Sequence, residues 1–249
     1  MESRAQQWRL RPLVLSLVLS AVLFITYVLP PTAGYWHVVD TWFAFALNSW
    51  VETSHVQQLI WSVGNMRVFD YVVAVIMLGV LLHYVFKGRF ATPSVRGAQA
   101  IVVSVMLVVL VAITRDLLFQ HFPHPSPSLV LEPFTRLTET NSLDFKDSSG
   151  VSFPGDHATV VSTFVFLLWV LAGWRYGLTA AVIAVVACLP RLVAGAHWLT
   201  DDVVGGGGTA LATVPWVVYT PLAGWLTDHL APPLARLGWC LVPGHRRRA

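Results

Sequence analysis

Charged residues are scarce in this sequence, and so are cysteines. Only 12% of the 249 residues are charged, about half the share of a typical soluble domain, while 55% are hydrophobic. This composition excludes an ordinary soluble protein and indicates a membrane protein. The two cysteines, Cys188 and Cys240, exclude a disulfide framework. No group of ligand-type residues has the spacing of a metal site, so we expect neither a metal nor another cofactor.

Long apolar stretches account for most of the chain. A membrane-spanning helix needs about 20 predominantly apolar residues. The first stretch is too long for the core of a typical signal peptide and ends in Pro30 and Pro31, so it is predicted to be a retained span. With no internal repeat and no linker, we expect residues 1–249 to form a single all-α domain, a six-transmembrane-helix bundle. The predicted spans are residues 12–29, 70–86, 98–114, 157–173, 177–190 and 203–219.

Basic residues are distributed unevenly between the two sides of these spans. Short cytoplasmic loops carry an excess of Lys and Arg, so the more basic side is predicted to be cytoplasmic. We therefore expect a multi-pass membrane protein with both chain ends in the cytoplasm and three loops that face outward. The residues on the basic side are Arg4, Arg9, Arg11, Lys87, Arg89, Arg96, Arg175, Arg236, Arg246, Arg247 and Arg248.

The first two outer loops differ in character. Residues 31–68 are apolar, and their tryptophans have helix-like spacing. Because tryptophan prefers the headgroup level of a bilayer, we expect interfacial helices in this loop. Residues 115–152 form the long polar loop of the chain, and long loops in compact proteins are often functional. The tryptophans of the first loop are Trp36, Trp42, Trp50 and Trp61.

A polar segment precedes the fourth predicted span. It consists of Ser152-Phe153-Pro154-Gly155-Asp156-His157, in which a turn-forming proline and a glycine precede a possible cap residue. These residues predict a helix start, where unpaired backbone N–H groups and the helix dipole favour phosphate binding. A histidine beside such a site, here His157, can protonate a leaving phosphate oxygen.

A second polar group precedes the sixth predicted span. Arg191, His197 and Asp201 are separated by five and three residues. A helix would place His197 and Asp201 on one face, where the carboxylate can accept the proton of one ring nitrogen and leave the other free to attack. Arg191 follows Pro190, which is expected to end or kink the fifth span, and its guanidinium matches phosphate oxygens.

These ionisable residues are predicted at one depth on one side of the membrane. Singly, His157 is explained as an interfacial histidine, Arg191 as a headgroup anchor and Asp201 as a helix cap. Together they favour a functional site, because ionisable groups are expensive at this depth. A transporter or assembly subunit would instead distribute such residues through the spans. The run Gly205 to Gly208 is interpreted as close helix packing, because the strand and turn of a phosphate loop are missing.

The two polar groups resemble motifs of a known family. The pattern from Arg191 to Asp201 resembles the third motif of the type 2 phosphatidic acid phosphatase superfamily, and the segment ending in His157 resembles its second motif. The resemblance implies metal-independent phosphoryl transfer through a phosphohistidine at His197. His157 would then be the general acid, and Asp201 would orient His197.

The second and third motifs depart from the family pattern. Gly155 and Asp156 stand where the family has serine and glycine, and Pro190 replaces the serine before Arg191. By the same resemblance, Gly155, Asp156 and Arg191 are expected to bind the substrate phosphate.

The first motif is reduced further. The lysine and the arginine–proline pair of the family have as counterparts Arg115 and the His124-Pro125 step at imperfect spacing. Arg115, His124 and Lys146, which share one loop, are expected to contact phosphate. Arg67 and Asp70, at the start of the second span, form either a structural ion pair or contacts with the headgroup of an acceptor.

One branch of the family is similar over nearly the whole chain. The altered motifs, the segment Asn65 to Asp70 and the segment Val214 to Leu222 resemble the lipid A 1-diphosphate synthases of Gram-negative inner membranes. This resemblance implies undecaprenyl diphosphate as donor and the 1-phosphate of lipid A as acceptor. The alternative is a lipid diphosphate phosphatase that uses water as acceptor. No nucleic acid and no obligate protein partner are expected.

Overall fold

The computed structural model describes residues 7–89, 91–114 and 123–241. These residues form helices and no named strand; a single isolated bridge joins His124 and Val151. The prediction of an all-α fold is therefore confirmed. The helices are α1 (Leu10–Val28), α2 (Pro30–Glu52), α3 (His55–Gly64), α4 (Arg67–Lys87), α5 (Pro93–Ala112), α6 (Pro127–Val130), α7 (Leu137–Thr140), α8 (Asp156–Leu171), α9 (Trp174–Val193), the π-helical η3 (Asp201–Gly207), α10 (Gly208–Val218) and α11 (Leu222–Leu241).

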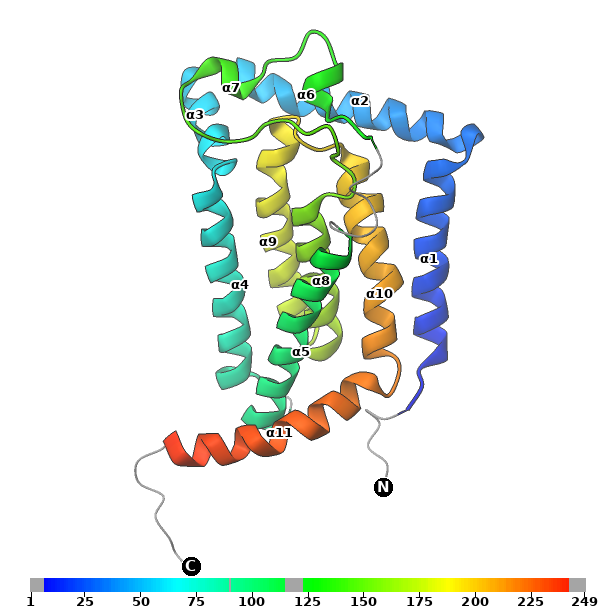
Figure 1. The fold of residues 1–249 in the computed structure, drawn as a ribbon, viewed down its shortest axis with the longest axis vertical. Coiled ribbons are helices and arrows are strands. Elements are labelled where there is room, and N and C mark those ends of the chain that lie inside the picture. Colours follow the sequence, from blue (N-terminus) through cyan, green and yellow to red (C-terminus); the bar gives the residue numbers. More distant parts are fainter. Residues whose placement is uncertain (1–6, 90, 115–122, 242–249) are drawn as a thin grey trace, which may run out of the picture.

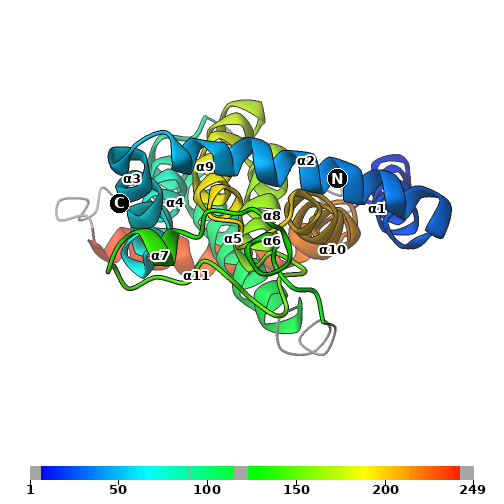
Figure 2. The same ribbon diagram turned by 90° about the horizontal axis from the view of Figure 1, so that it is seen from above.

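The long helices run side by side, with α2 across one end of the bundle and α11 across the other (Figure 1). Figure 2 shows α8 among the other helices when the bundle is seen along its length, and α8 contacts α5, α9, η3 and α10. Its residues Phe164, Leu167 and Leu168 are fully buried in the main hydrophobic core. The helix that begins with Asp156 and His157 is therefore held rigidly by its neighbours.

Among the described residues, four helices are long and apolar enough to cross a membrane: α1, α4, α5 and α9. They correspond to four of the six predicted spans. The fourth predicted span, α8, is apolar but has only 16 residues. The sixth is divided between η3 and α10, where the backbone changes from π-helical to α-helical. The count of six spans stays a prediction.

The helices that cross the ends of the bundle have clear local causes. Leu29 adopts an extended conformation and Pro30 and Pro31 follow, so α1 stops and α2 starts in a new direction. Asp40, buried in α2, accepts hydrogen bonds from the backbone N–H and the hydroxyl of Thr200, at 3.0 and 2.6 Å. These bonds attach α2 to the loop before η3.

Helix α11, which contains Pro232 and Pro233, was not predicted from the sequence. The helix nevertheless forms, and Ala223, Leu226 and Leu230 pack in a small hydrophobic cluster with α5 and α10. An amphipathic helix lying on a bundle needs only one apolar face, so the requirement of a spanning helix does not apply to it.

The glycine run lies where η3 crosses the start of α8. A Cβ atom on Gly206 would lie 2.6 Å from the carbonyl carbon of Ala158, and one on Gly205 would lie 2.8 Å from Pro154 Cβ. Real Cβ atoms do not approach other atoms so closely. The geometry therefore supports the packing interpretation of this run.

Candidate active site

Most of the predicted site residues meet at the α2 end of the bundle, in a cleft of about 720 Å³. Among the predicted residues, Arg67, Asp70, Lys146, Asp156, His157, Arg191 and His197 line this cleft. Asp201 is fully buried against His197. Gly155 and His124 do not line the cleft, and Arg115 lies outside the described residues. The chain therefore brings together residues from α4, the polar loop, α8 and the end of α9.

His197 lies in the turn between α9 and η3. Its Nδ1 lies 3.3 Å from Asp201 Oδ2, and the same oxygen accepts a hydrogen bond of 2.9 Å from the backbone N–H of Trp198. The prediction of a shared helix face was wrong, because the turn itself brings the two side chains together. With Nδ1 donating to the buried carboxylate, Nε2 is the nitrogen left for chemistry.

The charge state of His197 depends on two opposing effects. Its side chain is only 14% exposed, and burial lowers the pKa of the imidazole. The hydrogen bond to Asp201 and the negative charge of that carboxylate act in the opposite direction and prevail, so the pKa of His197 is raised above its ordinary value of 6.5. The site therefore favours positive charge on this ring.

Arg191 is held by Asp70 of α4 and by Asn65, which lies between α3 and α4. Pro190 was expected to end or kink the fifth span. Helix α9 continues through Pro190 to Val193, so Pro190 does not end it, and Arg191 lies in the last turn. Its guanidinium donates to Asp70 Oδ1 at 2.7 Å and to Asn65 Oδ1 at 3.0 Å. Asn65 also donates to the Pro190 carbonyl at 2.8 Å. The arginine is thus fixed in the wall of the cleft.

Asp70 joins Arg191 to His157. In the described part of the chain, its ion pairs are formed with these two residues and not with Arg67. His157, the second residue of α8, has its Nε2 3.1 Å from Asp70 Oδ1 and 3.2 Å from Arg191 Nη2. Nε2 of His157 therefore lies between a carboxylate oxygen, which can accept its proton, and the guanidinium of Arg191.

His124 contacts Asp201 but does not line the cleft. Its Nδ1 lies 2.9 Å from Ser152 Oγ and 3.4 Å from Asp201 Oδ1, and its Nε2 lies 2.8 Å from the hydroxyl of Tyr27. This position differs from that of a phosphate contact in the cleft. Two histidines thus approach the two oxygens of one buried carboxylate.

The amide of Gly155 also has a different partner from the one expected. It donates to the Asp201 carbonyl at 3.2 Å, so it is not an unpaired N–H group at the helix start. A Cβ atom on Gly155 would lie 2.7 Å from Asp202 Oδ1. Glycine is therefore required here because the start of α8 passes directly over the start of η3.

An apolar groove continues from the polar cleft along the side of the bundle. This second cavity, of about 500 Å³, shares Arg67, Asp70, Asp156 and His157 with the cleft. The rest of its lining is mostly apolar and comes from α4, α5, α8 and α9. These residues are Tyr71, Val73, Ala74, Met77, Val111, Val160, Val161 and Ala187. An amphiphile with a charged head can occupy both cavities at once.

The sequence analysis did not assign a role to Asn65 or Asp40. Asn65 belongs to a segment that was singled out only for its family resemblance, yet it positions Arg191. Asp40 is a lone acid in an apolar stretch, and such residues are buried only with partners. The position of Asp40 in an apolar stretch could therefore have predicted that it has a buried polar partner, which the structure shows to be Thr200.

Within the described residues, no group of three or more His, Cys, Asp or Glu side chains is arranged to hold a metal ion. The metal-independent reaction stays a prediction.

Comparison with known proteins identifies the family. The model of the PAP2 superfamily matches residues 124–223, which include both histidines, Arg191 and Asp201. The chain is 30% identical over 214 residues to the Lipid A 1-diphosphate synthase of Escherichia coli (strain K12), which covers 85% of this chain and 88% of that protein. No solved structure matches the chain. This chain, with its paired histidines, arginine and buried aspartate around one cleft, therefore belongs to the PAP2 superfamily.

Proposed function

We propose that this protein is a phosphotransferase of the inner membrane. It moves the terminal phosphoryl group of undecaprenyl diphosphate to the 1-phosphate of lipid A, giving undecaprenyl phosphate and lipid A 1-diphosphate. The family and the similar Lipid A 1-diphosphate synthase support phosphoryl transfer between lipids. The polar cleft with its apolar side groove supports a substrate that has a phosphate head and a long hydrocarbon chain.

The proposed membrane arrangement has six spans, formed by α1, α4, α5, α8, α9 and η3 with α10. Helix α8 can be shorter than the others because it is surrounded by protein. Helices α2 and α3 lie in the periplasmic interface, and the cleft opens on that side. The chain ends lie in the cytoplasm, in agreement with the basic residues Lys87, Arg96 and Arg175 at the opposite helix ends.

In the first step, Nε2 of His197 attacks the terminal phosphorus of the donor. An N–P bond forms, the bridging P–O bond breaks, and undecaprenyl phosphate leaves with the proton of His157 Nε2 on its bridging oxygen. Asp201 stabilises the positive ring through Nδ1. Arg191 and Lys146 neutralise the charge that develops on the phosphoryl oxygens.

In the second step, an oxygen of the lipid A 1-phosphate attacks the phosphohistidine. The N–P bond breaks, a new P–O–P linkage forms, and His197 returns to its neutral state. The acceptor phosphate enters with a proton on the attacking oxygen, and His157 Nε2 takes that proton, which restores the general acid. The positively charged Arg67, at the mouth of the cleft, is proposed to bind the acceptor headgroup, whereas Asp70 acts by holding Arg191 and His157.

The observation that carries this proposal is the contact of His197 with the buried Asp201 at the wall of a cleft that also holds Arg67, Lys146 and Arg191. The pair fixes one ring nitrogen and leaves the other for attack, which is how a base and an orienting acid activate a nucleophile. The alternative, a phosphatase, uses the same pair with water as acceptor.

The test uses protein purified in detergent without added metal and undecaprenyl diphosphate labelled in its terminal phosphate. Label on lipid A is the expected result, and it should disappear in His197→Ala. Release of inorganic phosphate at the same rate with and without lipid A would instead support the phosphatase. Full activity in His197→Ala would refute the nucleophile, and label movement that requires an added metal would refute the metal-independent reaction.

A further inference from the structure

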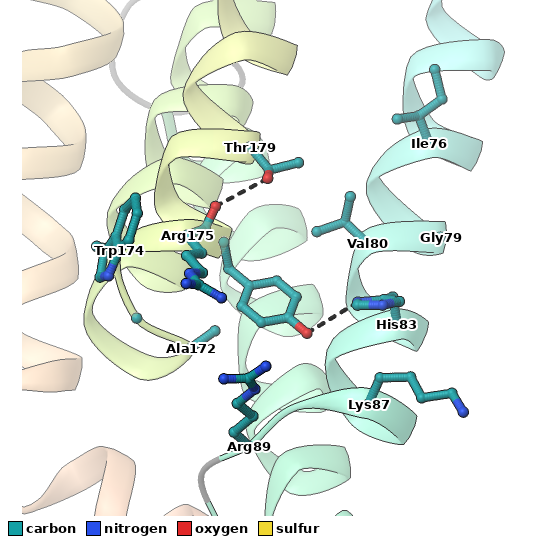
Figure 3. A pocket seen from close by; sticks show the side chains of 12 residues that line it. Ile76, Gly79, Val80, His83, Lys87, Arg89, Ala172, Trp174, Arg175 and Thr179 are labelled. Carbon is teal, nitrogen blue, oxygen red and sulfur yellow. Dashed lines mark hydrogen bonds between the residues drawn. The ribbon is translucent and has the colours of Figure 1, made fainter.

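A separate cavity of about 950 Å³ lies between α4 and the first turns of α9, at the end of the bundle opposite to the cleft (Figure 3). It shares no lining residue with the cleft or with the apolar groove. The reaction proposed above does not use it. Its upper wall is formed by Ile76, Gly79 and Val80 of α4 and by Thr179 of α9, and its lower wall contains Lys87, Arg89 and Arg175.

The lower wall of the cavity carries an excess of positive charge. None of the described residues that line the cavity is acidic. Arg175 lies over the ring of Trp174, 5.5 Å from its centroid, which holds the guanidinium at the cavity without neutralising it. Cations gathered without a counter-charge repel each other, so this wall is stabilised by an anion. Arg96 is different, since it is buried among backbone carbonyls that satisfy it.

The upper wall of the cavity is apolar and open. Gly79 lines the cavity, and a Cβ atom added to it would meet nothing within 4 Å. This open part of the cavity beside α4 is called the hollow at Gly79. Toward the charged end, Tyr176 reaches across from α9, and its hydroxyl lies 3.0 Å from His83 Nδ1 (Figure 3). One cavity therefore joins a hydrocarbon surface to a basic surface.

We propose that this cavity binds an anionic glycerophospholipid of the cytoplasmic leaflet. The phosphate group lies against Arg89 and Arg175, and an acyl chain lies along the hollow at Gly79. The proposal rests on the membrane orientation given above, because the basic end must face the leaflet that supplies the lipid. The orientation of the protein in the membrane is enough to explain why basic residues occur at this end of the bundle. It does not explain why the apolar hollow at Gly79 lies in the same cavity as these basic residues.

The position of the cavity gives the lipid a structural role. Helix α4 carries Asp70 in its first turn and Lys87 in its last, and α9 carries Arg175 in its first turn and Arg191 in its last. A lipid that contacts both helices at the basic end therefore stabilises the pair whose opposite ends form the bond between Asp70 and Arg191. The bound lipid is expected to raise the Tm of the protein.

The experiment titrates full-length protein in a neutral detergent with dioleoylphosphatidylglycerol and follows Tm by tryptophan fluorescence. Dioleoylphosphatidylcholine and inorganic phosphate serve as the neutral-lipid and free-phosphate arms. Each basic residue near an anionic lipid surface strengthens binding about fivefold, so the double variant Arg89→Gln/Arg175→Gln should need about 25 times more anionic lipid for half of the Tm shift. The matched control, Arg11→Gln/Arg236→Gln, removes two exposed charges that do not line the cavity and should titrate as wild type.

A second variant tests the hollow without changing charge. Gly79→Leu fills it and should abolish the shift caused by the anionic lipid. Gly34→Leu, on an exposed part of α2 where an added Cβ also meets nothing, should not. A Tm in neutral detergent close to that of wild type shows that each variant is folded.

Several outcomes would overturn the proposal. These are an equal loss of binding in the two double variants, no loss in either, normal binding by Gly79→Leu, and a shift produced equally by inorganic phosphate or by the neutral lipid. The measurement follows binding and not phosphoryl transfer. A failure here therefore leaves the chemistry proposed for His197 untouched, and an inactive enzyme can still show the lipid-dependent shift.

Discussion

Gly206→Ala is the substitution for which the structure gives the sharpest prediction. The added methyl group would lie 2.6 Å from Ala158 C, 2.7 Å from Ala158 Cβ and 2.8 Å from Thr159 N. Ordinary contacts between carbon atoms are about 3.5 to 4.0 Å, so η3 and the start of α8 must separate by about 1 Å. Overpacking of this kind costs about 1 to 3 kcal/mol, and the upper part applies here because two of the three atoms belong to backbone.

The effect on activity should exceed the effect on stability. Ala158 follows His157, and η3 begins at Asp201, so the clash separates the two halves of the site. A misplacement of about 1 Å can lower a catalytic rate about 100-fold. We therefore expect kcat/KM for phosphoryl transfer to fall by about that factor in Gly206→Ala, together with a lower Tm in detergent.

Gly207→Ala is the matched control. A Cβ atom at Gly207 would lie 3.7 Å from its nearest neighbour, Asp202 O, which is an ordinary contact. Alanine is also a better helix former than glycine by about 1 kcal/mol. This variant should keep its activity and gain slightly in Tm. Equal activity and equal Tm in the two alanine variants would refute the close packing of η3 on α8 and its role in placing the histidines.

Three further predictions concern the pH dependence, the charged pair in the cleft and the turn before α5. Because the pKa of His197 is raised and the neutral ring is the nucleophile, the acid limb of the pH profile of kcat/KM should lie above pH 6.5. Asp201→Asn should move this limb to lower pH and reduce the maximal rate. A limb that stays in place would contradict the assignment of His197 as the nucleophile oriented by Asp201. Asp70→Asn weakens the hold on Arg191 and should lower kcat/KM about 100-fold with little change in Tm, whereas an unchanged rate would show that Asp70 does not position the site. Arg96→Met leaves the carbonyls of Val85 and Ala91 without their donor and should lower the free energy of unfolding by on the order of 3 kcal/mol. Its Tm should therefore be lower than that of Arg236→Met, which changes an exposed arginine. Equal Tm values would argue that the hydrogen bonds of Arg96 do not stabilise the turn before α5.

The sequence was sufficient to predict one contact at the cleft. The spacing of His197 and Asp201 indicated a contact between them, and the structure has one at 3.3 Å. The reason for the contact was different. The prediction assumed a helix, whereas the structure has a turn in which Asp201 also binds the backbone of Trp198. Spacing alone restricts how far apart two residues are, but several backbone conformations satisfy the same restriction.

The partners of Asp70 and His124 could not be predicted in the same way. Asp70 lies 121 residues before Arg191 in the chain, and His124 and Asp201 come from segments with no common periodicity. Nothing local to either residue indicates its neighbour. The contacts of Asp70 are created by the packing of α4, α8 and α9, and the contact of His124 is created by the position of the polar loop beside η3. The chain also gave no signal for α11, since an amphipathic helix on the end of a bundle lacks the long apolar run of a span.

The sequence by itself determined the helical class, the four long apolar helices and the identity of the ionisable residues at the cleft. These features depend on composition and on short-range spacing, which the order of residues fixes directly. Only the tertiary structure decided that Asp70 binds Arg191 and His157, that His124 and His197 approach the same carboxylate, and that Gly206 lies against α8. Such contacts join distant segments, and their geometry follows from the way in which buried helices fill space together.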